Sequence, residues 1–292
     1  PRIKEAWNNL GRSLYAVGQY ERSIECYDEA LKVDPVYATA WNNKGIALGS
    51  LGRHQEALGC YEETLKIEPS HVMALYNRGI ALGFLGRQEE AVECYDEVLK
   101  LDPSYPPAWY NRGVALGLLG RFEEAATSYD GAIDLDPDYT QAWNNRGIAL
   151  GILGRQEEAL QSYDRALEID PTYPQAWYNR GVALSALGRY QEAIDSYDRA
   201  LELNPELTEA WNNKGIALSA LGRNEEAIEC YERALEAGRT SAGEIPEADL
   251  AAPEASVGLG VLTEPDLLEG PVEANDSEPM ATSILEWPRT EA

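Results

Sequence analysis

The sequence predicts an all-α fold in which seven 34-residue helix pairs stack into an alpha-alpha superhelix. Three observations predict it: residue types repeat every 34 positions, apolar residues follow helical spacing, and glycine and proline stand at fixed stops. Leu75 fills the one gap in a tryptophan series with this period, which consists of Trp7, Trp41, Trp109, Trp143, Trp177 and Trp211.

Four further residue types keep the same phase. A first glycine recurs at 11, 45, 79, 113, 147, 181 and 215, and a second at 18, 52, 86, 120, 154, 188 and 222. Tyrosine recurs at 27, 61, 95, 129, 163, 197 and 231, and proline at 35, 69, 103, 137, 171 and 205. A fixed period of this length, with no insertion between copies, indicates a stacked repeat architecture.

Residues 140–173 show why each copy predicts two helices. The range 141–153 places large apolar residues at Trp143, Ile148, Leu150 and Leu153, and Gly154 then ends the helix as a C-cap. The range 157–169 has apolar residues at a spacing of three and four, namely Ala159, Leu160, Tyr163, Ala166 and Leu167. Asp170-Pro171 ends the second helix, because the residue before proline disfavours helix. A pair this short must stack on its neighbours to bury its apolar face.

The period divides the chain into a remnant, an array and a tail. Residues 1–3 are interpreted as the end of an earlier, truncated repeat, because Pro1 is 34 positions before Pro35. The seven predicted repeats are 4–37, 38–71, 72–105, 106–139, 140–173, 174–207 and 208–238. Residues 239–292 contain 12 acidic and 2 basic residues, which predicts a disordered acidic tail. Neither end shows a polar capping helix of the kind that a free solenoid needs.

The repeat resembles the tetratricopeptide repeat (TPR) family. The match is carried by Trp143, Gly147, Leu150, Ala159, Tyr163, Ala166 and Pro171, with their equivalents in the other copies. One position departs from the family pattern: the residue before the first glycine is leucine only at Leu10, and the other copies have lysine or arginine. The resemblance implies a right-handed TPR solenoid whose first helices line the concave face.

Composition excludes several classes of function. The net charge is -26, which argues against nucleic-acid binding because phosphate backbones require a cationic surface. No apolar run approaches the roughly 20 residues of a membrane helix. With two histidines and four cysteines, the chain offers no metal site and no cofactor motif. No catalytic constellation is found, so the prediction is that the protein is not an enzyme.

An asparagine two residues after the tryptophan position is the sharpest candidate site. It occurs in every copy, as Asn9, Asn43, Asn77, Asn111, Asn145, Asn179 and Asn213. An amide can pair with both the N–H and the C=O of a peptide unit. With equivalent helices about 10 Å apart, one asparagine would meet every third residue of an extended ligand. The row resembles the asparagine ladder in the TPR domain of O-GlcNAc transferases, which implies binding through the peptide backbone.

The alternative for these asparagines is that they bond within or between repeats and position helices. Tyr76, Tyr110 and Tyr178 flank the row as candidate peptide-binding residues, and packing is the equal alternative for them. For the Ile/Val row that includes Ile148, packing between repeats is favoured. The carboxylate clamp of chaperone-binding members of the family is absent, since its positions hold Asn, Gln, Thr, Met or Pro.

Two basic rows and one cysteine position have structural interpretations. The Lys/Arg row that includes Arg146 is expected to reach acidic neighbours. The arginines after the helix-ending glycines, such as Arg155, are expected to complement helix dipoles. Cys26, Cys60, Cys94 and Cys230 share a position that is Ser128, Ser162 and Ser196 elsewhere, which indicates a small-residue packing site. Free thiols in phase suit a reducing, cytoplasmic compartment.

The predicted function is a scaffold that binds a protein or peptide ligand in the concave groove. The alternative is a substrate-recruiting TPR arm of a larger enzyme, such as a glycosyltransferase, whose catalytic part is absent. Uncapped solenoid ends also allow self-association.

Overall fold

The computed structural model describes residues 2–242, and within that range it contains α-helices and short loops but no strand. The fourteen helices of this range are α1 Arg2–Ala16, α2 Tyr20–Val33, α3 Ala38–Ser50, α4 His54–Ile67, α5 Val72–Phe84, α6 Gln88–Leu101, α7 Pro106–Leu118, α8 Phe122–Leu135, α9 Thr140–Ile152, α10 Gln156–Ile169, α11 Pro174–Ala186, α12 Tyr190–Leu203, α13 Thr208–Ala220 and α14 Asn224–Ala242. The predicted all-α array of helix pairs is therefore confirmed.

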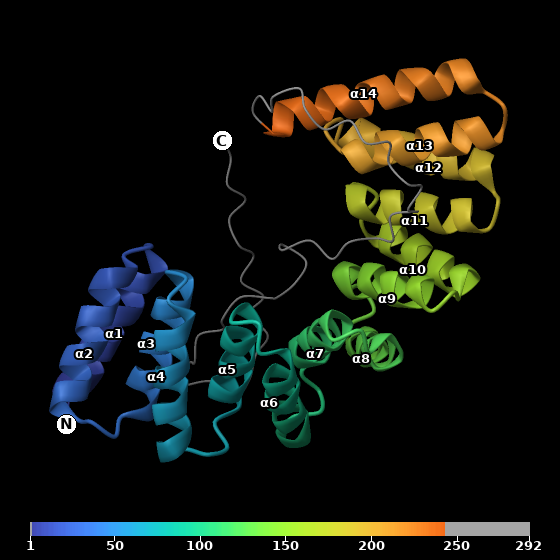
Figure 1. Cartoon of the computed structure of the whole chain (residues 1–292). Helices are drawn as coiled ribbons and strands as arrows, with labels where there is room; N and C mark the ends of the chain where they lie inside the picture. Colours follow the sequence, from blue (N-terminus) through green and yellow to red (C-terminus); the bar gives the residue numbers. More distant parts are fainter. Residues whose placement is uncertain (1, 243–292) are drawn as a thin grey trace. The chain divides into compact units, whose positions relative to one another are not determined.

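The described helices fall into two units (Figure 1). The first unit holds α1 to α7, in residues 2–119, and the second holds α8 to α14, in residues 120–242. Within each unit every helix packs on the next one along the chain. First helices also touch the first helix of the following repeat, as α3 touches α5 and α9 touches α11. The array is therefore held together by contacts between near neighbours in the sequence.

The helix boundaries follow the predicted ones closely. α9 and α10 begin one residue before the predicted starts at 141 and 157, and α9 ends one residue earlier than predicted. Two differences lie at the ends of the array. Arg2 and Ile3 belong to α1, and α14 continues to Ala242, four residues into the segment predicted as a tail. The prediction for the rest of the tail, 243–292, lies outside the described residues.

Gly154 shows how the first helix of a repeat is stopped. Its φ is +77°, in the left-handed region that glycine adopts without a steric penalty. The N–H of Arg155 then donates to the carbonyl of Leu150 at 2.9 Å, and the N–H of Gly154 to that of Gly151 at 3.0 Å. These two bonds form the Schellman arrangement, which satisfies carbonyls left over at the helix end.

The other recurring residue types contact one another. A Cβ on Gly147 would lie 2.5 Å from the Tyr163 ring, so the tyrosine of the second helix fills the space that the first glycine leaves. The indole Nε1 of Trp143 donates to the carbonyl of Pro137 at 2.9 Å, which ties each first helix to the loop before it. The same two contacts recur in other repeats, for example at Gly181 and Trp177. The shared period of these residue types thus reflects direct packing.

Candidate functional site

The predicted asparagine row lies inside the stack of first helices. Asn9, in the first repeat, is exposed. The other six side chains are at most 8% exposed: Asn43, Asn77, Asn111, Asn145, Asn179 and Asn213. Their helices bring them into one row within each unit, but the row faces neighbouring helices.

Hydrogen bonds explain the burial of these amides. The Nδ2 of Asn43 donates to Asn8 Oδ1 at 3.0 Å, and that of Asn179 donates to Asn144 Oδ1 at 3.0 Å. Asn111 donates to the Tyr76 hydroxyl at 2.9 Å, and Asn213 donates to that of Tyr178 at 3.1 Å. Each partner lies 35 residues earlier in the sequence, directly before the row asparagine of the preceding repeat. The geometry favours the inter-repeat alternative, and direct peptide contact by the asparagines stays a prediction.

The three candidate tyrosines are buried beside this row. Tyr76 is fully buried, and Tyr110 and Tyr178 are nearly so. The Tyr76 ring meets the edge of the Tyr105 ring at 5.1 Å between centroids. Burial raises the pKa of Tyr178 to about 12, although the Asn213 hydrogen bond opposes the shift. The Tyr178 hydroxyl therefore stays protonated at neutral pH. The hydroxyls of Tyr76 and Tyr178 accept hydrogen bonds from Asn111 and Asn213. The Ile/Val row is packed as predicted from Ile46 to Val182, whereas its last member, Ile216, is 36% exposed.

The accessible part of the same helix face lies at the helix ends. Residues 73, 76, 80 and 84 of α5 share one stripe, because intervals of 3, 7 and 11 residues return to the same side of a helix. Tyr76 and Ile80 are buried in the middle of the stripe, whereas Met73 is half-buried and Phe84 is 54% exposed. Leu118 takes the Phe84 position in α7 and is 46% exposed.

Sequence reasoning missed Phe84 and Leu118. Both are the last residue of a first helix, next to Gly83 and Gly117, and about half of each side chain stays exposed. The Phe84 ring stacks on His54 with centroids 4.4 Å apart and an interplanar angle of 4°, which holds it in one orientation. The signal in the sequence was the wide range of residue types at this position, which holds Ala16, Ser50, Phe84, Leu118, Ile152, Ala186 and Ala220. The core positions that carry the repeat, such as the first glycine and the tyrosine, keep one residue type.

Most side chains of the two basic rows pair with carboxylates. Arg146 Nε lies 2.5 Å from Asp130 and its Nη1 lies 2.7 Å from the Ser162 hydroxyl, which confirms the predicted acidic partner. Arg155 instead forms a two-pronged pair with Glu158, at 2.7 and 2.6 Å, in the first turn of α10. The side chain therefore reaches the following helix, and the interaction with the dipole of the preceding helix stays a prediction. The Arg155 hydrogen bond lowers the pKa of Glu158.

The cysteine position is a packing site, as predicted. Cys26, Cys60, Cys94 and Cys230 are free and buried. Burial raises the pKa of Cys60 to about 12 and that of Cys94 to about 11, so both remain neutral thiols at physiological pH.

Comparison with protein families accounts for nearly the whole described array. Models described as "Tetratricopeptide repeat" match residues 8–71, 43–106, 76–140, 128–161, 174–207 and 208–237, and a "TPR repeat" model matches 152–188. The chain belongs to the tetratricopeptide repeat family. A search of curated proteins finds no match to the sequence.

Solved structures support the TPR fold. A TPR protein from Parabacteroides merdae is 19% identical with a TM-score of 0.63, over 82% of this chain and 94% of that one. YrrB, titled as a TPR protein with an unusual peptide-binding site, is 24% identical with a TM-score of 0.57, over 64% and 96%. MamA is 24% identical with a TM-score of 0.54, over 56% and 96%.

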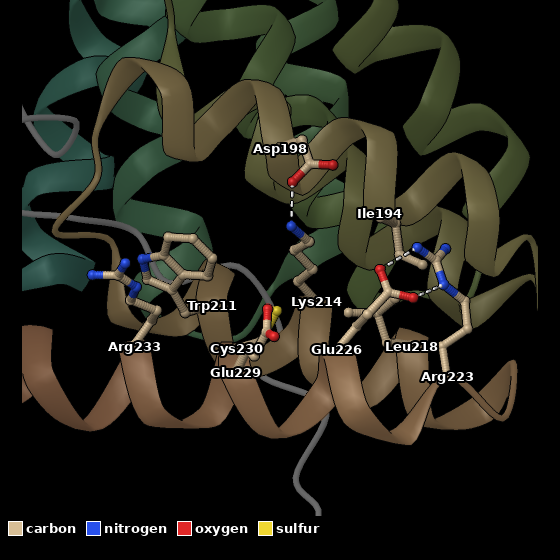
Figure 2. A pocket seen from close by; sticks show the side chains of 10 residues that line it. All are labelled: Ile194, Asp198, Trp211, Lys214, Leu218, Arg223, Glu226, Glu229, Cys230 and Arg233. Atoms are coloured by element: carbon tan, nitrogen blue, oxygen red, sulfur yellow. Dashed lines mark hydrogen bonds and ion pairs between the residues drawn. The ribbon is translucent and has the colours of Figure 1, made fainter.

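A cavity of about 370 Å³ opens in the last TPR repeats, among α12, α13 and α14 (Figure 2). Lys214 bonds Asp198 at 2.5 Å there, whereas its counterpart Arg180 reaches both Asp164 and the Ser196 hydroxyl. The Lys214 side chain ends in a single nitrogen where Arg180 has a guanidinium group, and Cys230 takes the place of Ser196. The two side chains therefore fill less of the space between the helices. The lining holds three acidic and three basic residues, and this balance selects no charge on a ligand.

The described residues offer neither a membrane-spanning helix nor a metal-binding cluster. None of the helices in 2–242 is both long and apolar enough to cross a membrane. Within the same range, histidine, cysteine and carboxylate side chains form no cluster suited to a metal ion.

Proposed function

We propose that this TPR protein is a non-enzymatic scaffold that binds an extended peptide segment of a partner protein across its first helices. Membership of the family supports a protein-binding role, and YrrB, a structural neighbour, is described as having a peptide-binding site. One observation carries the proposal: the first helices α5 and α7 end in large apolar side chains that the stack leaves accessible, Phe84 and Leu118.

This accessible strip suits an apolar peptide side chain. Phe84 and Leu118 occupy equivalent positions on successive first helices, and α5 and α7 are in contact. The glycine before each of them is only half-buried, which leaves room for a ligand backbone to approach. The pair would supply selectivity, in the role that sequence reasoning gave to Tyr76, Tyr110 and Tyr178.

The asparagine row enters the proposal with two separable roles. In the first, Asn43 to Asn213 hold the first helices at a fixed spacing, which the inter-repeat bonds of Asn111 and Asn179 support. In the second role, the predicted backbone contact, the asparagine amides bind the main chain of the peptide. Asn9, which is exposed, is the member of the row that can contact a ligand without rearrangement.

A displayed library of random twelve-residue peptides, selected on the full chain, tests the proposal. We expect enriched peptides to share an apolar residue, and Phe84→Ser with Leu118→Ser to weaken them about 10- to 100-fold. Full burial of one apolar side chain contributes about 1.5–3 kcal/mol, and a ligand can bury only the exposed half of each of these two side chains. The matched control is Leu101→Ser on the second helix α6, where the leucine is 49% exposed. Equal loss in the control, or no loss in the pair, would contradict the proposal.

The same peptides separate the two roles of the asparagines. A variant with Asn111→Ala, Asn145→Ala and Asn179→Ala should melt at a lower temperature, because buried partners lose hydrogen bonds. If it still binds while folded, the positioning role stands. If affinity is lost while circular dichroism and melting are unchanged, the row contacts the peptide directly.

A further inference from the structure

The outer face of the last helix pair is apolar and uncovered. Ile228 is 55% exposed and Leu235 is 58% exposed, whereas their counterparts Ile194 and Leu201 in the preceding repeat are 3% and 6% exposed. Ile216 is 36% exposed against 7% for its counterpart Val182. The residues are those of a packed interface, but no helix of the described range follows α14 to cover them.

Inner repeats show what such a face requires. α13 packs on α12 and also touches α11, so one following helix covers the outer face of a whole pair. The covering helix contributes small and large apolar side chains, such as Ala210 and Leu218, which are buried. A partner for α13 and α14 therefore needs an apolar helix face with little charge.

We infer that residues 280–287 of this chain, Met-Ala-Thr-Ser-Ile-Leu-Glu-Trp, dock on the outer face of α13 and α14. The segment follows α14 in the same chain and contains one charged residue, Glu286. Its apolar residues recur at a spacing of three and four, at Met280, Ile284 and Trp287. Pro279 and Pro288 stand where a short helix would begin and end.

The other apolar stretch beyond α14 fits this face less well. Residues 257–268 contain Gly258, Gly260 and Pro265, which disfavour a helix, and two acidic residues, Glu264 and Asp266. Burying either carboxylate against Ile228 or Leu235 would cost free energy, because nothing on an apolar face compensates a charge.

The connection is long enough for intramolecular docking. Thirty-seven residues separate Ala242 from Met280. A flexible linker of this length spans about 34 Å on average. The 19-residue helix α14 is about 28 Å long. The effective concentration of the segment at the face is therefore on the order of millimolar, as for other flexible linkers. Such a concentration favours the chain's own segment over a second copy.

Cysteine cross-linking on the full chain tests the inference. The four native cysteines are changed to serine, the residue that occupies their position in three repeats, and Ile228→Cys is combined with Ile284→Cys. The matched control combines Ile228→Cys with Leu267→Cys. We expect an intrachain disulfide to form at least 10-fold faster in the first variant during mild oxidation at low protein concentration. Equal rates, or chiefly disulfide-linked dimers, would overturn the inference, and dimers would assign the face to a second copy.

Hydrogen exchange gives an independent readout without new cysteines. Ile284→Asp should increase amide exchange in α13 and α14 about 10-fold, while α9 and α10 stay unchanged. Leu267→Asp is the control and should leave α13 and α14 as in the native chain. Unchanged exchange in Ile284→Asp would overturn the inference whatever the cross-linking result. Peptide affinity at Phe84 and Leu118 is measured separately, so neither outcome depends on the proposed function.

Discussion

At the scale of single residues, the repeat is set by glycines that make room for tyrosine rings. Gly147→Ala should destabilise the array by about 1–3 kcal/mol, because the new Cβ would lie 2.5 Å from the Tyr163 ring and the interior is already packed. Gly59→Ala is the matched control: this helical glycine is exposed, and no atom lies within 4 Å of the added Cβ.

Gly59→Ala should instead stabilise the array by about 0.5–1 kcal/mol, because alanine loses less conformational entropy than glycine when it enters a helix. Urea denaturation followed by circular dichroism measures both variants. A loss of stability in Gly59→Ala, or none in Gly147→Ala, would refute this account of the recurring glycine.

Residue identity predicted where the helices end, but it did not decide whether the asparagines bind a ligand or bond between repeats. Gly154 and Pro171 mark helix ends by local backbone geometry, so the sequence suffices for α9 and α10. A helical wheel gives the direction of Asn179, but not the distance to the next first helix. That distance is set by the side chains of both repeats, and it buries the Asn179 amide against Asn144. For the same reason the wheel did not single out Phe84, whose exposure depends on where α5 ends.

At the scale of helices, the second helices from α4 to α14 begin with an arginine–glutamate pair that should respond to acid. The pKa of Glu158 is lowered from its ordinary value of 4.5 by the Arg155 hydrogen bond. A carboxylate with a lowered folded-state pKa adds stability above the unfolded value and loses it as pH falls through the folded value. The contribution is therefore present at pH 7 and is lost as the pH falls below 4.5 and through the lowered folded-state pKa.

Thermal melts of a variant with Arg155→Gln, Arg189→Gln and Arg223→Gln measure this effect. The variant should melt below the native chain at pH 7, and the two melting temperatures should converge at pH 3. The reciprocal control replaces Glu158, Glu192 and Glu226 by glutamine, and it should show the same loss at pH 7. A gap between native chain and variant that persists at pH 3 would mean that the arginines stabilise the helices in another way.

At the scale of the whole molecule, the array should tolerate removal of one complete repeat. Deleting 174–207 places Asn213 where Asn179 was, so its amide meets Asn144 in the same register. Circular dichroism should show unchanged helicity per residue, with lower stability because one inter-repeat interface is lost. Deleting only 174–190 is the control, and it should unfold the second unit locally because α12 then lacks its first helix. Equal behaviour of the two deletions would contradict the register argument.

The packing of each helix on its near neighbours in the chain also has a mechanical consequence. Within each unit, helices pack closely only on neighbours and next neighbours in the chain, so no contact ties distant repeats together. A pulling force would act on the interfaces between neighbouring helices in series. Each interface would deform slightly before any one of them broke. Such a unit would be elastic, and it could lengthen or twist slightly to follow the peptide that we propose as its ligand.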